Sequence, residues 1–315
     1  MTGHLPPGAP LWFWVAFNAL IVALLMVDLG IFQRHPHSMR KREATLRVAA
    51  MVTLAMLFNA WVFYAWGHQR GLEFLAGYLI EYSLSVDNVF VFIVIMNYFD
   101  VAKAHQHRVL FWGILSALVM RGAFIALGAA LLRRFEWVGI LMGAFLVFTG
   151  VRLMLTDEHQ IHPERNPVVR FFRRFVPMTS SYRDARFVVK EAGRLLATPL
   201  LLVLIVVEIT DILFAVDSIP AIFAVTRDPF IVYTSNVFAI LGLRALYFLL
   251  AGVLDELRYL KLGLAFVLVF VGLKMAGEKL VHVSIGVSLG IIAAILGIAT
   301  LASIIHDRTG PSGKR

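Results

Sequence analysis

Long apolar segments alternate with short polar ones along most of the 315-residue chain. Several apolar runs approach or exceed 18 residues, the length that a helix needs to cross about 30 Å of hydrocarbon. The pattern therefore predicts an all-α, polytopic membrane protein with about nine transmembrane helices. The predicted helices cover residues 10–32, 46–66, 72–99, 108–132, 136–156, 197–225, 231–254, 259–279 and 283–305.

The composition supports a membrane protein and explains the basic charge. Apolar residues make up 60% of the chain, the mean hydropathy is +0.80, and the formal net charge is +9. Of the 29 Lys and Arg residues, 20 fall in alternate loops and the tail, which is the positive-inside pattern and needs no nucleic-acid partner. We expect a multi-pass protein of a bacterial inner (plasma) membrane, with the N-terminus outside and the C-terminus in the cytoplasm. The chain has no cysteine, which excludes disulfides and thiolate metal sites.

One long basic loop interrupts the alternation. It is interpreted either as a solvated linker or, around Phe171–Phe175, as a basic amphipathic piece on the inner leaflet. It divides the chain into an N-terminal two-helix segment, a first repeat, the loop, a second repeat, and a last helix with a cytoplasmic tail. The predicted boundaries are 1–71, 72–156, 157–196, 197–279 and 280–315.

Carboxylates lie inside two of the apolar segments in matching positions. Aligning Asp87 with Asp217 places Glu81 on Asp211. A charged residue at the centre of a bilayer costs about 2.5–3.5 kcal/mol even on the lenient insertion scale. Helix packing does not require that cost, so the two pairs predict a site for a cation.

The similarity between the two halves extends past these acids. Arg121 and Arg244 lie in similar surroundings, and Phe145–Met154 resembles Val267–Met275. The order is kept at three places, and each copy contains three predicted spans. Because three is odd, the second copy enters the membrane from the opposite side, which predicts an inverted-topology repeat with the substrate site near the midplane.

Other polar residues join the predicted site. Asn88 adjoins Asp87, and Glu208 lies three residues before Asp211 on the same helical face, as an additional candidate ligand. Residues six apart lie about 120° apart around a helix, so we expect a break between the members of each pair. Pro220 supplies a reason for one in the second copy, because proline has no N–H for the carbonyl of Val216.

The charges narrow the ligand. The acids Glu81, Asp87, Glu208, Asp211 and Asp217 sum to −5, and Arg121 and Arg244 leave −3. A divalent cation would leave −1, and hard oxygen ligands favour Mg, Ca or Mn. Without metal, some acids should hold protons, which is a physical basis for proton-coupled exchange. The alternative is that the two arginines each pair with an acid and join helices, although five acids exceed two arginines.

At these residues the chain resembles the TerC/Alx family of integral membrane proteins, over about residues 10–305. The segments that carry the resemblance are Glu81-Tyr82-Ser83-Leu84-Ser85-Val86-Asp87-Asn88 and Phe214-Ala215-Val216-Asp217-Ser218-Ile219-Pro220-Ala221, together with Val27-Asp28-Leu29-Gly30 and Arg244. The resemblance implies a divalent metal exporter in a superfamily similar to the LysE-type exporters, with manganese as the favoured substrate.

Three other classes stay open beside a proton-coupled metal exporter. They are a non-transporting membrane stress or scaffold protein, a calcium or organic-cation transporter, and an intramembrane enzyme. The Gly-x-Gly-Asp element of intramembrane aspartyl proteases is absent from the sequence, so we expect no enzyme and no cofactor. The expected partners are the metal substrate and the lipid bilayer. The oligomeric state is left open.

Overall fold

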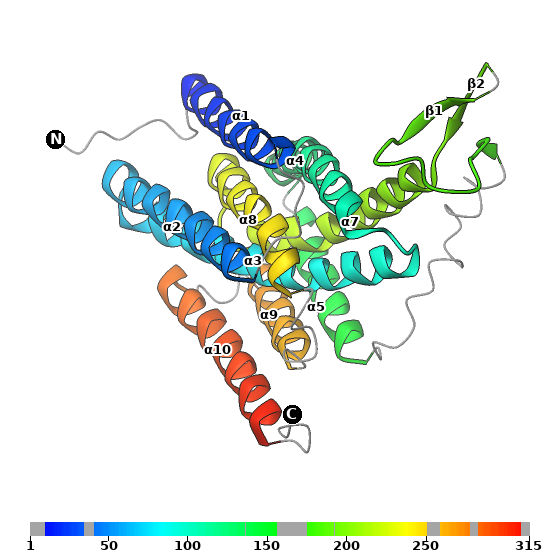
Figure 1. Cartoon of the computed structure of the whole chain (residues 1–315). Helices are drawn as coiled ribbons and strands as arrows, with labels where there is room; N and C mark the ends of the chain where they lie inside the picture. The colour runs from blue at the N-terminus through cyan, green and yellow to red at the C-terminus, as the bar shows by residue number, and fades with distance from the viewer. Residues whose placement is uncertain are drawn as a thin grey trace.

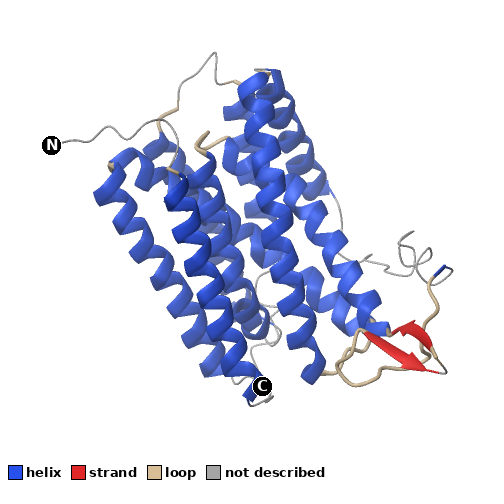
Figure 2. Cartoon of the chain, turned by 90° about the horizontal axis from the view of Figure 1, so that it is seen from above, coloured by secondary structure: helices blue, strands red, loops and turns tan. Residues whose placement is uncertain are grey.

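The computed structural model describes residues 10–34, 41–135, 137–155, 175–191, 193–250, 259–277 and 283–309. In this part of the chain the protein is a bundle of long helices with one small β-hairpin at its end (Figures 1 and 2). The helices are α1 (Leu11–Arg34), α2 (Lys41–Trp66), α3 (His68–Tyr98), α4 (Lys103–Arg134), α5 (Trp137–Leu155), α7 (Pro199–Phe223), α8 (Pro229–Leu250), α9 (Leu260–Ala276) and α10 (Ile285–Thr309). The prediction of an all-α, polytopic membrane protein is confirmed.

Seven helices within the described residues are long and apolar enough to cross a membrane. They are α2, α3, α4, α5, α7, α8 and α10. Two others are shorter by the same measure: α1 has its apolar stretch at Leu11–Met26, and α9 has 17 residues. Nine membrane spans, as opposed to nine helices, therefore stay a prediction.

The helices extend beyond their predicted apolar segments. α2 begins at Lys41 and not at residue 46, and Arg47 donates to Glu43 one turn earlier at 2.8 Å. Charged residues of high helix propensity continue the helix into the aqueous layer, where such a pair supports it. Hydropathy finds only the length that lies in lipid, which explains the early starts of α2, α3 and α4.

The most enclosed helix is α8, and the outermost are α2 and α10. In the best apolar window of α8, 89% of the residues are buried, against 17% in α2 and in α10. Figure 1 shows α8 (yellow) among α1, α2, α3, α4 and α7, with α10 (red) at the edge. In a membrane, the exposed apolar side chains of α2 and α10 would contact lipid.

Helices α5 and α9 approach most closely, at glycines. A Cβ on Gly272 would lie 2.6 Å from the Gly143 carbonyl oxygen, and one on Gly150 would lie 2.8 Å from that of Ala265. Small residues let membrane helices bring their backbones together, because lipid gives no hydrophobic drive for larger side chains to associate. Glycine is required at these places by space and not by backbone conformation.

The second half of the long basic loop is folded, which sequence analysis missed. Strands β1 (Val188–Glu191) and β2 (Arg194–Ala197) form an antiparallel hairpin with Gly193 at φ +78° in the turn. The Tyr182 hydroxyl donates to the Phe99 carbonyl at 2.6 Å, which holds the hairpin region against the α3–α4 turn. Burial, with Asp100 nearby, raises the pKa of the Tyr182 hydroxyl above its ordinary value. Residues 171–174 of the predicted amphipathic piece lie outside the described residues.

We call the bundle end that carries this hairpin the hairpin end and the other the far end (Figure 2). α3 ends and α4 and α7 begin at the hairpin end, while the α7–α8 turn lies at the far end. The positive-inside pattern assigns the hairpin end to the cytoplasm. That orientation stays a prediction.

Candidate cation site

A buried arginine on α4 holds two acids from two other helices. Arg121 contacts Glu81 of α3 through Nη1, and it binds Asp211 of α7 in a bidentate manner. The Nη2–Oδ1 distance to Asp211 is 3.0 Å and the Nε–Oδ2 distance is 3.3 Å. Arg121 is 1% exposed, Glu81 0% and Asp211 5%. When both acids are ionised, one guanidinium facing two carboxylates leaves one net negative charge in a buried place.

These three side chains lie near the mid-height of the bundle. Asp211 lies 12 residues from either end of α7, which is about 18 Å at 1.5 Å per residue. Glu81 and Arg121 are similarly far inside α3 and α4. The arrangement therefore occupies the depth where ionisable residues in membrane proteins are rare and mark substrate paths or proton relays.

One face of α3 presents polar atoms that have no hydrogen-bond partner in the described structure. They are Oε2 of Glu81, Oγ of Ser85 and Nδ2 of Asn88. Spacings of four and three residues place these side chains along one side of the helix. All three are 2% exposed or less. Because buried polar groups are normally satisfied, the unpartnered oxygens of Glu81 and Ser85 are exceptions that a bound cation would explain, whereas the Asn88 nitrogen is a donor and would not bind one.

The Arg121 network also includes Ser218, whose Oγ accepts from Nη1 at 3.2 Å. In the alignment of the two acidic stretches, Ser218 corresponds to Asn88. The site thus receives matching polar positions from α3 and α7. The structure brings Glu81, Asp211 and Arg121 together, and their roles as metal ligands and as a balancing charge stay predictions.

Glu208 lies beside the Arg121 network rather than in it. Ser116 of α4 donates to Oε1 of Glu208, and Oε2 of Glu208 is buried with no partner in the described structure. Ser116 has one proton, and the carbonyls of Trp112 and Gly113 lie 2.9 and 3.0 Å from its Oγ as competing acceptors. Glu208 is thus a third membrane carboxylate, one helical turn from Asp211 toward the hairpin end.

Asp217 faces a different neighbour. Thr149 of α5 donates to its Oδ1 at 3.2 Å, and Asp217 is only half-buried. Asp87 lies in α3, but its side chain is outside the described ones. Among the side chains that are described, no three of His, Cys, Asp and Glu gather as a metal cluster. Convergence of Asp87 with Asp217 on one ion therefore stays a prediction.

The expected helix breaks are absent, and this prediction was wrong. α3 is helical throughout 68–98, and α7 is helical throughout 199–223 with Pro220 inside it. Pro220 lies only three residues before the helix end, so the missing N–H removes one bond of the last turns. The long Arg121 side chain reaches Glu81 and Asp211 from a third helix, and their helices need not unwind.

A narrow crevice leads to Asp211 from the hairpin end. Its lining includes Leu110 and Gly113 of α4, Val207 of α7 and Leu243 of α8, all on the hairpin side of Asp211. Its open volume of about 10 Å³ is close to the space that one water molecule needs. The crevice is nearly closed in this conformation.

An ionic network joins two helical segments at the far end. Arg70 bridges Glu73 at 3.2 Å and Asp228 at 2.9 Å, and Thr226 donates to Glu73 at 2.6 Å. Glu73 is 6% exposed. These contacts tie the start of α3 to the α7–α8 turn, that is, one predicted repeat to the other.

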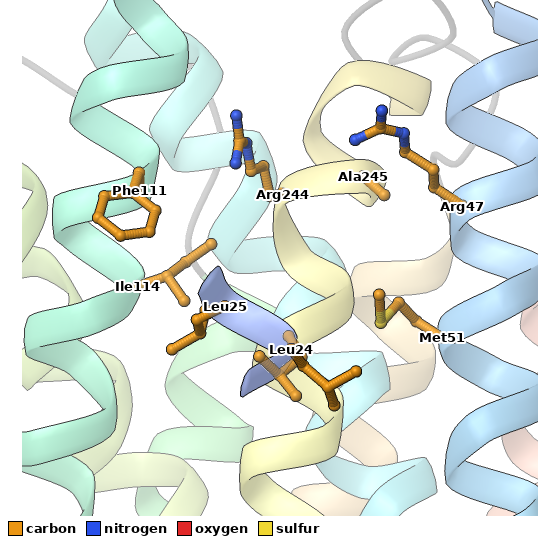
Figure 3. Close-up of a pocket in the computed structure, with 9 residues that line it drawn as sticks. Leu24, Leu25, Arg47, Met51, Phe111, Ile114, Arg244 and Ala245 are labelled. Atoms are coloured by element: carbon orange, nitrogen blue, oxygen red, sulfur yellow. The ribbon is translucent and has the colours of Figure 1, made fainter. Parts of the chain in front are cut away.

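The described contacts of Arg244 differ from those of Arg121. Its Nη2 lies 3.5 Å from Nδ1 of His107, and it lines a separate cleft with Arg47 (Figure 3). Asp87 lies on α3, which packs along α8, but its side chain is outside the described ones. The predicted charge-balancing role of Arg244 is therefore not tested.

Comparison with protein families decides the classification. The profile of the family described as "Integral membrane protein TerC family" matches residues 66–310, which include every predicted site residue. The chain belongs to the TerC family. The resemblance inferred from residues 81–88 and 214–221 is confirmed.

Several relatives match this TerC-family protein over most of its length. An uncharacterized membrane protein of Myxococcus xanthus, STKORF319, is 50% identical over 95% of this chain and 94% of its own. "Putative membrane-bound redox modulator Alx" of Escherichia coli K12 is 47% identical over 92% of each chain. "Thylakoid membrane protein TERC, chloroplastic" of Arabidopsis thaliana is 44% identical over 89% of this chain and 73% of its own. No solved structure matches the chain.

Sequence analysis missed the hydroxyl partners in this TerC-family protein. Ser116, Thr149 and Ser218 each contact a candidate site residue from α4, α5 or α7. Serine and threonine are common in membrane helices, where they often bond their own backbone, so their presence alone carries no signal. Only Ser218 carried a usable sequence signal, because it aligns with Asn88.

Proposed function

We propose that this TerC-family protein is a secondary transporter that exports a divalent metal cation, with manganese favoured, in exchange for protons. One observation carries the proposal: Glu81 and Asp211, from two helices, share a single arginine at mid-height, where all three side chains are buried. The excess negative charge there is the kind of charge that a cation neutralises. The choice of manganese and the direction of transport come from the resemblance to TerC/Alx proteins.

The donor set supports a hard cation. Glu81, Ser85, Asn88 and Asp211 offer carboxylate, hydroxyl and amide oxygens, which suit Mg, Ca and Mn. The sequence contains no cysteine, so thiolate ligands for softer metals are absent. In the state without metal, Arg121 supplies the positive charge that the acids need. Metal entry would weaken the ion pair between Arg121 and Asp211. Metal binding would therefore change a contact between α4 and α7.

Proton exchange follows from the same ligands. A metal binds only deprotonated carboxylates, so protons and metal compete for Glu81 and Asp211. Glu208 is a further carboxylate beside the path, and Ser116 holds one of its oxygens. Apparent metal affinity is therefore expected to rise as the pH rises, and protons arriving from the far end would release metal there.

The two ends of the bundle support alternating access. A crevice lies beside Asp211 on its hairpin side, and the Arg70–Glu73–Asp228 network joins the two predicted repeats at the far end. A larger opening of about 440 Å³ also lies at the far end, between α1, α4 and the start of α8. Transport in an inverted repeat requires two arrangements, one of them with the far-end ion pairs broken.

A second function is favoured by the Arg121 contacts themselves. Bidentate pairing to Asp211 is the geometry of a structural connection between helices, as in a non-transporting stress or scaffold protein. The name of Alx describes a redox modulator. A redox role based on thiols is excluded here because the sequence has no cysteine. The unpartnered oxygens of Glu81 and Ser85 favour transport, because both are oxygen atoms that a cation could bind.

Oriented vesicles test the proposal. Protein is reconstituted with a manganese-sensitive dye on one side and a pH-sensitive dye on the other, and Mn²⁺ is supplied at the hairpin end. We expect Mn²⁺ flux with an opposite flux of protons, and loss of both in Glu81→Gln and Asp211→Asn. Glu191→Gln is the matched control, because Glu191 pairs with Arg183 on the exposed hairpin at 2.7 Å. Normal flux in Asp211→Asn would remove the proposed site.

A further inference from the structure

The β1–β2 hairpin has one face packed on the bundle and one face turned away from it. Exposure alternates strictly from Ala185 to Glu191, as expected for an extended strand. On the packed face, the centre of the Phe187 ring lies 5.3 Å from the guanidinium carbon of Arg108 on α4, and Phe187 also packs against the apolar core. The other face is therefore open to whatever surrounds the bundle at this end.

The face that points away combines cations with apolar side chains. Arg186, Val188 and Lys190 alternate along β1 and the residues just before it, and all three are exposed. Lys190 pairs with Leu195 in the hairpin register, which brings Leu195 to the same face. Val188 is 46% exposed and Leu195 69%. We call these four residues the outward face, and their mixture is typical of surfaces that lie in a membrane interface.

The basic charge of this region does not depend on any single pairing. Residues 157–196 contain eight Lys and Arg and five Asp and Glu, which gives a net charge of +3. Glu191, the acid next to Lys190 in the sequence, lies on the packed face and pairs with Arg183 at 2.7 Å. Even if every acid of the segment paired with one of its bases, three cations would remain to attract an anionic surface.

The hairpin lies at the depth of the lipid headgroups. β2 ends at Ala197, and α7 begins at Pro199 with an apolar run from its first residue, so the edge of the hydrocarbon lies near Pro199. Leu195 is four residues earlier, at most about 13 Å along an extended chain. Figure 2 shows the strands to one side of the bundle, level with the helix ends. The headgroup layer, about 5–8 Å thick on each side of the hydrocarbon, surrounds the bundle at this level.

We propose that the outward face of the hairpin lies against the anionic lipid surface of the leaflet at the hairpin end. Arg186 and Lys190 bind the phosphates of acidic headgroups, and Val188 and Leu195 enter the boundary between headgroups and acyl chains. Lipid is the partner because the face lies beside the bundle at headgroup depth, where lipid is already present, and because its cations attract acidic headgroups. The proposal depends on the membrane location of the chain and not on metal transport.

A probe on the outward face tests this contact in the full-length protein. The natural chain has no cysteine, so Leu195→Cys carries a single fluorophore, and Arg194→Cys carries it on the opposite face as the position control. The labelled protein is placed in nanodiscs of phosphatidylcholine with or without phosphatidylglycerol, and a lipid with a nitroxide headgroup serves as quencher. We expect stronger quenching of the Leu195→Cys probe than of the Arg194→Cys probe, and a further increase with phosphatidylglycerol.

Charge substitutions in the Leu195→Cys background identify the contacts. Arg186→Gln and Lys190→Gln should each lower the ratio of docked to undocked hairpin about fivefold, since one basic residue near an anionic leaflet contributes roughly that factor. Arg183→Gln is the matched control, because it removes one cation that already pairs with Glu191. It should lower the ratio less than either of the other two substitutions.

Several results would overturn the proposal. They are equal quenching at the two probe positions, quenching that does not change with phosphatidylglycerol, and an equal effect of all three Gln substitutions. Shielding of the Leu195→Cys probe in detergent without lipid would also overturn it and would indicate a protein partner. Hydrogen exchange of residues 188–197 in the unsubstituted protein covers the case in which a label or substitution disturbs the hairpin. We expect slower exchange with phosphatidylglycerol present, and equal exchange in the two lipids would contradict the contact.

Discussion

Arg121 and Arg244 occupy corresponding places in two similar stretches, yet their described contacts differ. Arg121 is 1% exposed and binds Glu81 and Asp211, whereas Arg244 is 6% exposed, contacts His107 and lines a cleft with Arg47. Sequence similarity alone assigns both the same role. The difference teaches that an arginine in a membrane helix takes its function from the charges that other helices bring to it.

The contrast between these arginines predicts different costs of removal. Arg121→Gln leaves Glu81 and Asp211 buried without a cation, which is expected to destabilise the protein by about 3–5 kcal/mol. Arg244→Gln is expected to cost less than this if the carboxylate of Asp87 does not pair with Arg244, and a similar amount if it does. Thermal unfolding of both variants in the same detergent measures the difference.

Metal rescue sharpens this comparison. If the acids form a cation site, Mn²⁺ should stabilise Arg121→Gln more than it stabilises the wild type, because the ion replaces the lost positive charge. No such rescue is expected for Arg244→Gln. Equal losses of stability in the two variants, with no selective rescue by Mn²⁺, would mean that the two arginines are equivalent.

The packing of α5 on α9 tests the predicted repeat. Gly150 corresponds to Gly272 at an offset of 122 residues, and Gly143 corresponds to Ala265 at the same offset. The close approach of Gly150 to Ala265 therefore maps onto that of Gly272 to Gly143. Gly150→Ala and Gly272→Ala are expected to cost similar amounts, about 1–3 kcal/mol each, because both add a Cβ against backbone.

Gly290→Ala is the control for this pair. A Cβ there has no neighbour within 4 Å, so the variant should be neutral or slightly stabilising in α10. Unfolding curves for the three variants give the comparison. A large cost at Gly150 with none at Gly272 would argue against a symmetric α5–α9 contact.

The two ends of the bundle should differ in access. The natural chain has no cysteine, so a single introduced thiol reports cleanly. Ala117→Cys, in the crevice wall, should react with a small thiol reagent added at the hairpin end. Adding Glu73→Gln weakens the far-end network and should raise labelling from the far side about tenfold, which corresponds to about 1.4 kcal/mol. Faster labelling from the far side before that change would show that the network is not a closure.

The smallest expected effect concerns the hairpin. Tyr182→Phe removes the bond to the Phe99 carbonyl and should cost about 1 kcal/mol locally. Because burial raises the pKa of Tyr182, the docked hairpin favours the neutral hydroxyl. Its contribution is complete below the ordinary tyrosine pKa near 10 and is lost as the pH rises through the folded value. Hydrogen exchange of residues 188–197 at neutral pH and near pH 11 measures this.

Much of the fold followed from the sequence, because a bilayer imposes a long apolar run on every span. Glu81, Asp211 and Arg121 were found for the same reason, since a charge in such a run is costly and rarely accidental. The hairpin at 188–197 could not be found, because its short strands have mixed polar and apolar faces and their order depends on contacts with the α3–α4 turn. The break between Glu81 and Asp87 was wrongly expected. That prediction assumed that both carboxylates must face the same ion, and it did not consider that a side chain from a third helix could reach Glu81.

Equilibrium binding of Mn²⁺ to the purified protein tests the central claim most directly. Electron paramagnetic resonance of free Mn²⁺ gives the bound fraction across a titration, at two pH values. We expect saturable binding that tightens as the pH rises, weakens at least about tenfold in Glu81→Gln and Asp211→Asn, and is kept in Glu191→Gln; a tenfold loss is about 1.4 kcal/mol of binding free energy. Wild-type affinity for Mn²⁺ in both acid variants would contradict the assignment of Glu81 and Asp211 as a cation site.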